Sequence, residues 1–182
     1  AVCTDKTGTL TENRMTVVRA ASPESERLAT ALSLCTDASE HADGSIVGDP
    51  TQAALVAYAS GLGLHKSELD ARFPRTAVLP FDSARKLMTT VHRAPADTAV
   101  QYTKGAPDVL LEHCTAALIG GEVVPMTEQL RERIEAENRA MAEQALRVLA
   151  AAYRPLTELP GDCSPDSLEQ GLIFLGLVGM ID

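Results

Sequence analysis

The chain has 182 residues, 45% of them hydrophobic, and a formal net charge of −9. This composition predicts a globular protein with a substantial core and excludes a chain that is disordered throughout. The negative charge argues against nucleic acid as a partner, although an anionic ligand needs only a local cationic pocket. The longest nearly uncharged apolar run, residues 171–181, is far shorter than the roughly 20 residues of a membrane-spanning helix, so we expect a soluble chain.

The first dozen residues contain a short apolar lead-in, a single aspartate and a hydroxyl-rich turn, in the run Asp5-Lys6-Thr7-Gly8-Thr9. A carboxylate at a strand end, followed by free backbone N–H groups, is what a phosphoryl-accepting aspartate requires. Gly8 leaves the approach open, and the two threonines add hydroxyl donors. The alternative is a surface turn that Asp5 caps. The complete run favours the phosphoryl acceptor.

The hydrophobic periodicity changes from helical to strand-like near Arg75 and is mixed thereafter. The predicted elements of the first part are a strand over 15–20, a helix with Ser22 as N-cap and Pro23 as its first residue, a loop over 36–48, a helix from Asp49 to Gly61 and a short helix over 67–73. The later elements are strands over 77–79, 87–92 and 98–103, a helix over 107–114, a hairpin over 117–124, a helix from Thr127 to about Gln144, and strands over 147–153 and 172–178. Strands grouped between helices favour an α+β fold, with an antiparallel β-sheet flanked by helices.

Two further clusters have the chemistry of an anion or nucleotide site. In the run from Pro80 to Lys86, an aromatic ring and two cations lie between two strands, where the ring can stack on a purine. The alternative is that Phe81 belongs to the core. In the run from Tyr102 to Asp108, Lys104 and Gly105 lie between a strand and a predicted helix start, which is a plausible anion site or an ordinary turn.

Taken together, these runs resemble the phosphorylation motif and nucleotide-binding domain of P-type cation-transporting ATPases of the calcium-pump-like subfamily. The resemblance covers the whole chain. It implies that Asp5 forms an aspartyl phosphate, with Lys6 and Thr7 as further catalytic residues, and that Asp5 and Thr7 contribute to a Mg²⁺ site that is incomplete here. The implied nucleotide-binding residues are Gln52, Phe81, Lys86, Lys104, Gly105 and Arg147, with Phe81 on adenine and Arg147 toward the phosphates.

Two positions depart from the family pattern. Ser83 stands where some calcium pumps have an arginine, so one phosphate contact is missing or is supplied by Arg85. Gln52 replaces the usual glutamate, and it contacts adenine, completes a capping box with Asp49, or does both.

The resemblance implies the ATP-binding part of a longer pump, excised from it. Residues 1–12 would be the phosphorylation-loop strand, residues 13–171 the nucleotide-binding domain, and residues 172–182 the return strand, with the first and last of these as neighbours. The expected ligands are ATP and, in the intact protein, Mg²⁺. The expected partners are the phosphorylation, actuator and membrane domains of the same pump, with this domain on the cytoplasmic side. The chain alone is expected to bind nucleotide without turnover.

Two other functions fit part of this sequence. A soluble phosphatase of the haloacid dehalogenase superfamily shares the nucleophilic aspartate, but such enzymes usually carry a second acid two residues later, where this chain has Thr7. A non-catalytic nucleotide-binding module is the third possibility, and Asp5 argues against it for the intact protein. The four cysteines are scattered and fit free thiols, with Cys114 buried beside His113 rather than bound to a metal.

Overall fold

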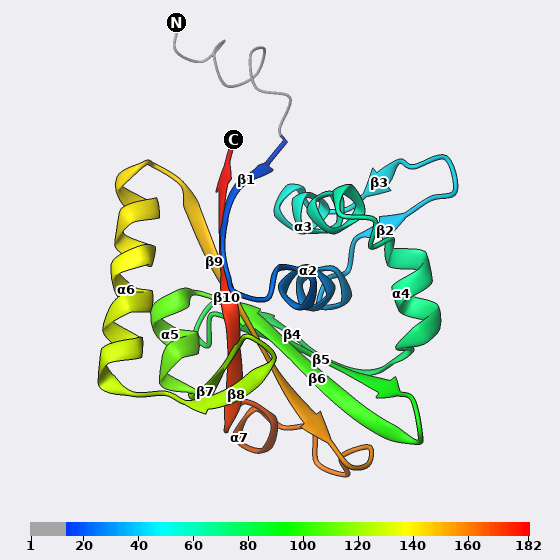
Figure 1. The fold of residues 1–182 in the computed structure, drawn as a ribbon. Helices are drawn as coiled ribbons and strands as arrows, with labels where there is room; N and C mark the ends of the chain where they lie inside the picture. The colour runs from blue at the N-terminus through cyan, green and yellow to red at the C-terminus, as the bar shows by residue number, and fades with distance from the viewer. Residues whose placement is uncertain (1–13) are drawn as a thin grey trace, which may run out of the picture.

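A computed structural model describes residues 14–182 and shows one twisted β-sheet with helices on both faces (Figure 1). The strands of this sheet are β1 (Thr16–Ala21), β4 (Arg75–Asp82), β5 (Leu87–Ala94), β6 (Thr98–Gly105), β7 (Cys114–Ile119), β8 (Glu122–Pro125), β9 (Arg147–Leu156) and β10 (Leu172–Ile181). Their order is β4-β5-β6-β9-β10-β7-β8, and β1 pairs with β10. All of these pairs are antiparallel except β10 with β7. The α+β prediction is confirmed, with one parallel pair added.

The helices form two groups, one on each face of the sheet (Figure 1). On one face lie α2 (Ser25–Leu34), α3 (Pro50–Gly61) and α4 (Lys66–Arg72). On the other lie α5 (Pro107–Glu112) and α6 (Glu128–Glu143), while the short α7 (Pro165–Leu168) precedes β10. Along residues 14–182, no helix is both long and apolar enough to cross a bilayer.

The core follows from the helical and strand periodicities of the sequence. Beneath α2 and α3, fully buried Leu28, Leu32 and Leu55 pack with residues of β5, β6, β9 and β10. On the other face, Leu110 of α5 and Met141 of α6 pack against a separate cluster from β9 and β10. Strand β10 is buried along nearly its whole length because it has neighbours on both sides and helices above and below.

Most of the predicted elements are confirmed, but the start of α2 is not. Its N-cap is Glu24, which makes no side-chain capping bond. Ser22 Oγ instead donates to Leu175 O at 2.6 Å and accepts from Glu24 N at 2.9 Å. Ser22 therefore ties the segment after β1 to β10 instead of capping the helix. The predicted loop over 36–48 also contains two short paired strands, β2 (Ser39–Glu40) and β3 (Ile46–Val47).

The turn chemistry gave correct boundaries elsewhere. Gly120 and Gly121 have φ angles of 60° and 82° in the turn between β7 and β8, a conformation that glycine adopts without a Cβ penalty. Thr127 Oγ1 accepts from Leu130 N at 3.1 Å and caps α6 as predicted. Thr16 of β1 lies opposite Ile181 of β10. Residues 1–12 lie outside the described part, so the proposed division into three segments stays a prediction.

Asp49 caps α3, and the contribution of this cap to stability can be tested. Its Oδ2 accepts from Thr51 N at 3.1 Å and from Gln52 N at 3.3 Å, and Pro50 follows at the first helical position. We expect Asp49→Ala to lower the free energy of unfolding by about 1 kcal/mol, measured by urea denaturation. Glu24→Ala is the matched control, because the Glu24 side chain caps nothing and its loss should change stability little. Equal effects of the two variants would contradict the capping role.

Candidate functional site

A pocket of about 610 Å³ opens between the N-terminal end of α3 and the sheet, and we call it the α3 pocket. Every nucleotide-binding residue named from the sequence lines it: Gln52, Phe81, Lys86, Lys104, Gly105 and Arg147. Asp37, Asp49, Thr51, Met88, Ala106, Val148 and Leu149 complete the wall. The fold therefore gathers residues from α3, β4, β6, β9 and the turn after β4 into one site.

Phe81 lies near the end of β4, and its exposed fraction decides between the two interpretations of this residue. It is 62% exposed, whereas the buried core leucines are at or near 0%. A core role is therefore excluded. An exposed ring on a pocket wall is available for stacking on a planar ligand.

The turn from Asp82 to Lys86 places the Lys86 side chain at the pocket. Asp82 Oδ1 accepts from Ala84 N at 2.7 Å and from Arg85 N at 3.2 Å, and these bonds lower the pKa of the Asp82 carboxyl. Lys86 N donates to Asp82 O at 2.5 Å and closes the turn. Lys86 itself has a φ of 63°, an unusual angle for a residue with a side chain.

Gly105 lies where a side chain would collide with this turn. A Cβ at this position would be 2.2 Å from Lys86 O and 2.8 Å from a methyl carbon of Leu87. The close neighbour is thus protein backbone, although the resemblance names Gly105 as a nucleotide-binding residue. Ala106 N donates to the same Lys86 carbonyl at 3.3 Å. Glycine therefore allows the turn to pack on the end of β6, which shapes the pocket wall.

Lys104 is 7% exposed and provides a buried amine in the wall. Its Nζ donates to Cys35 O and, at 3.3 Å, to Gln52 Oε1. Burial holds the pKa of Lys104 below its usual value, although the nearby Asp37 carboxylate acts in the opposite direction. An approaching anion would favour the charged form of this amine and would supply the counter-charge that its contacts lack.

Gln52 does not complete a capping box. Its Oε1 accepts from Asp37 N at 2.8 Å and from Lys104 Nζ, so the side chain joins α3 to the segment after α2 and to β6. Asp49 alone caps the helix. Gln52 also lines the α3 pocket, so its predicted contact with adenine stays open as a proposal.

Arg147 begins β9 on the opposite wall. Its Nη1 donates to Thr51 Oγ1 at 3.1 Å, and its side chain is exposed. This bond spans the pocket from β9 to α3. The guanidinium still has free donors on its fork, which suit bidentate contact with a phosphate oxygen pair.

The charges of the pocket are of mixed sign, but the acids are engaged. Asp37 forms an ion pair with Arg75 at 2.9 Å, and Asp49 caps α3. Lys86, Lys104 and Arg147 are the cations that face the hollow, and together with the Phe81 ring they suit an anion attached to a planar base. Within residues 14–182, no group of three or more His, Cys, Asp or Glu side chains could hold a metal ion.

Three predicted site residues fall outside the part that the structure describes. Asp5, Lys6 and Thr7 belong to residues 1–13, so their catalytic and Mg²⁺ roles rest on the sequence.

Among the described residues, Arg85 does not line the α3 pocket, and its guanidinium contacts Glu169 at 2.7 Å. This favours a missing phosphate contact at Ser83 over its replacement by Arg85. Cys114 is buried as expected, and burial raises the pKa of its thiol to about 12.

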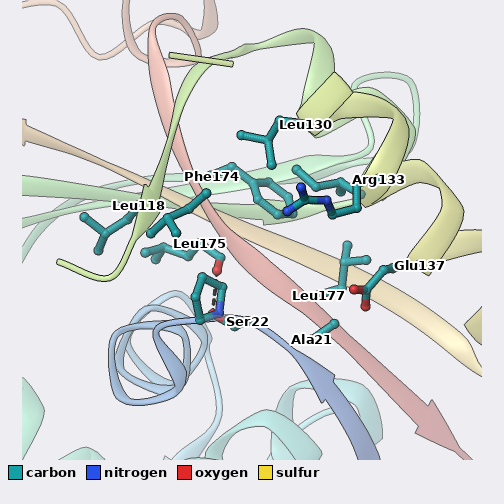
Figure 2. A pocket seen from close by; sticks show the side chains of 12 residues that line it. Ala21, Ser22, Leu118, Leu130, Arg133, Glu137, Phe174, Leu175 and Leu177 are labelled. Atoms are coloured by element: carbon teal, nitrogen blue, oxygen red, sulfur yellow. Dashed lines mark hydrogen bonds between the residues drawn. The ribbon is translucent and has the colours of Figure 1, made fainter. Parts of the chain in front are cut away.

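A second hollow of about 350 Å³ lies among α6, β7, β10 and the segment after β1 (Figure 2). Figure 2 shows the apolar side chains of Leu130, Phe174 and Leu177 directed into it, with Arg133 and Glu137 at the side of α6. None of the six residues named above contributes to it. Its lining contains one cation, Arg133, and one acid, Glu137, whereas the α3 pocket is lined by three cations, so this hollow offers less to a polyanion than the α3 pocket does.

Comparison with known proteins identifies the family of this chain. A family model described as the P-type ATPase cytoplasmic domain N matches residues 24–182. The chain is similar over its full length to "Calcium-transporting ATPase 1" of Lactococcus lactis subsp. lactis (39% identical) and of Bacillus cereus (40% identical). It is also similar to "Calcium-transporting ATPase type 2C member 1" of Bos taurus (33% identical).

The chain spans 22% of the length of each of the two bacterial relatives and 21% of the bovine one. The family model covers most of the chain, including every strand of the main sheet except β1. The chain therefore belongs to the P-type ATPases, within the family of their cytoplasmic domain N.

Proposed function

We propose that this domain binds ATP in the α3 pocket and presents its γ-phosphate to Asp5 of the intact pump. The observation that carries the proposal is the convergence of an exposed aromatic ring and three cations on one hollow that is lined by all six predicted residues. Phe81 would stack on adenine with Gln52 beside it. Lys86, Lys104 and Arg147 would contact the phosphates and hold the nucleotide without taking part in bond breaking.

For the intact protein we propose cation transport across a membrane, with this domain on the cytoplasmic side. The carboxylate of Asp5 would attack the γ-phosphoryl group, forming an aspartyl phosphate and releasing ADP. Asp5 and Thr7 are the residues that would contribute to the Mg²⁺ site, where the ion would neutralise charge on the transferred group. Calcium, named in the relatives, is the proposed ion. Thr7 in place of a second acid supports the pump over a phosphatase, because it provides no base to activate water.

ATP should bind to this chain with a dissociation constant from about 0.1 to several mM, or about −5.5 to −3 kcal/mol. The pocket has one stacking ring and few cations, and it is open to water. Binding should change little when Mg²⁺ is removed, because residues 14–182 offer no carboxylate cluster for the ion. Amide shifts during an ATP titration measure this.

Shifts should concentrate near Phe81, Lys86 and Lys104, while residues of the second hollow such as Leu130 serve as the internal control. An absence of shifts near the α3 pocket at ATP concentrations tenfold above the upper estimate would remove the site assignment. Shifts only at the second hollow would move the site to the other pocket.

A further inference from the structure

The turn that carries Phe81 and Lys86 is held by an ion pair outside the α3 pocket, between Arg85 and Glu169. Arg85 Nε donates to Glu169 Oε1 at 2.7 Å. The Arg85 side chain is 21% exposed and that of Glu169 only 2%, so the carboxylate lies inside the protein. Neither residue lines the α3 pocket.

The Arg85 guanidinium also bridges the two ends of the turn. One of its nitrogens, Nη2, donates to Pro80 O at 3.1 Å and to Leu87 O at 2.9 Å. Pro80 immediately precedes Phe81, and Leu87 immediately follows Lys86. A single planar guanidinium therefore fixes the backbone on both sides of the two pocket residues. Without such contacts, a surface turn would be flexible.

Glu169 is in turn anchored on the sheet. Its Oε2 accepts from Thr89 Oγ1 at 2.6 Å, and Thr89 Oγ1 lies 2.8 Å from Thr103 Oγ1 on the next strand. The peptide that carries Glu169 is held as well, because Gln101 Nε2 donates to Leu168 O at 2.6 Å and His113 Nδ1 lies 2.7 Å from Glu169 O. The carboxylate thus has a fixed position before Arg85 meets it.

The backbone of the turn is in a conformation that needs such support. Lys86 has a φ of 63°, and its carbonyl is packed against Gly105. This conformation is unfavourable for a residue with a Cβ, and it persists only where surrounding contacts determine it. Without the contacts of Arg85 with Glu169 and the two carbonyls, which we call the Arg85 clamp, the turn would gain other conformations. In these, Phe81 and Lys86 would no longer face the pocket together.

We propose that Arg85 and Glu169 are positioning residues for nucleotide binding, which hold the 80–87 turn in its binding conformation before the ligand arrives. The proposal rests on the ATP site proposed above. Its physical basis is preorganisation, since a turn that is already ordered loses less conformational entropy when ATP binds.

The test uses the double variant Arg85→Met/Glu169→Met. Replacing both partners of a buried ion pair by apolar residues is often neutral or stabilising, so the fold should survive. Pro80 O and Leu87 O nevertheless lose their common donor. We expect the dissociation constant for ATP to rise about tenfold, as for the loss of one charge-assisted hydrogen bond. In the nucleotide-free protein, the amides of residues 84–86 should exchange faster.

Arg154→Met is the matched control. Arg154 Nη1 donates to Gln170 O at 2.8 Å and its Nη2 donates to Ser167 O at 3.3 Å, so it contacts residues on either side of Glu169 but neither the turn nor the Glu169 carboxylate, which Thr89 binds. It should leave ATP affinity and the exchange of residues 84–86 unchanged. A folded double variant with normal affinity and normal exchange would overturn the proposal, as would an equal effect of Arg154→Met.

The variant Arg85→Lys and the amide exchange rates test the proposal in two further cases. If the double variant does not fold, Arg85→Lys decides the question: it keeps the charge, but an ammonium cannot span Glu169 and both carbonyls, so weaker ATP binding and faster exchange are expected, and normal values refute the clamp. If the unmodified chain does not bind ATP, the function proposed for the α3 pocket fails and with it the positioning role in binding. The exchange rates would then show separately whether the ion pair orders the turn.

Discussion

Replacing Phe81 with alanine should weaken ATP binding by about 1–3 kcal/mol, the range for base–aromatic stacking. The melting midpoint should change little, because the ring is already 62% exposed and its removal leaves no internal cavity. A buried phenylalanine would behave differently, since its truncation costs about 3–5 kcal/mol of stability. Isothermal titration with ATP and a thermal melt of the same variant measure both quantities.

Two variants on the same strand provide the controls. Val78 is 39% exposed on β4 and does not line the α3 pocket, so Val78→Ala should leave affinity unchanged. Phe81→Tyr retains a ring and should retain most of the affinity. A large fall in the melting midpoint of Phe81→Ala with unchanged ATP affinity would contradict the stacking role.

Acidification should destabilise the domain through His92, a fully buried residue of β5. Its Nδ1 lies 2.8 Å from Phe73 O and its Nε2 lies 2.8 Å from Thr90 Oγ1, an arrangement that suits the neutral ring with Nδ1 as donor. Burial is the main cause that lowers the pKa of His92 from 6.5 to about 4, and nearby Arg75 and Lys66 act in the same direction.

The sign follows from proton binding in the two states. Above pH 6.5 the ring is neutral in both the folded and the unfolded chain, so it adds no pH dependence. As the pH falls from 6.5 to about 4, the unfolded chain binds a proton that the folded one does not, and stability is lost. The difference between these pKa values corresponds to about 3 kcal/mol.

Urea denaturation at several pH values, on the unmodified chain and on His92→Gln, measures this term. The variant should lose much less stability over this range, because glutamine cannot take up the proton. His41→Gln, at an exposed position, is the control and should keep the original pH dependence. Parallel pH dependences for the unmodified chain and His92→Gln would show that His92 does not contribute to acid destabilisation.

Local chemistry made the fold largely predictable. Asp49 with Pro50 defined the start of α3, the paired glycines defined the β7–β8 turn, and Thr127 defined the start of α6. The predictions were wrong or incomplete where the contact that determines the local structure is made with a residue distant in sequence. Ser22 looks like a helix cap, but Leu175 O draws its hydroxyl to β10. The parallel pair of β7 and β10 has no signal in either segment, because each is simply an apolar run.

At the site, too, the identities of the residues were predictable from the sequence, but several of their contacts were not. Family motifs named six residues, and the fold brings all six to one hollow. They did not reveal that Gln52 accepts from Asp37 N, that Gly105 makes room for the Lys86 carbonyl, or that Arg85 reaches Glu169. These contacts depend on the packing of separate elements. A single sequence carries no periodicity or spacing that reports them.

The strand order also constrains how this domain folds. Strands β4, β5 and β6 pair with sequence neighbours, so this meander can form through short loop closures. β1 can pair only with β10, which lies at the other end of the described chain. The second neighbour of β6 is β9, which is also distant in sequence. Non-local pairing of this kind slows folding. During synthesis from the N-terminus, the central part of the sheet therefore cannot close until residues 147–181 have emerged, and β1 and the free edge of β6 are exposed to wrong partners until then.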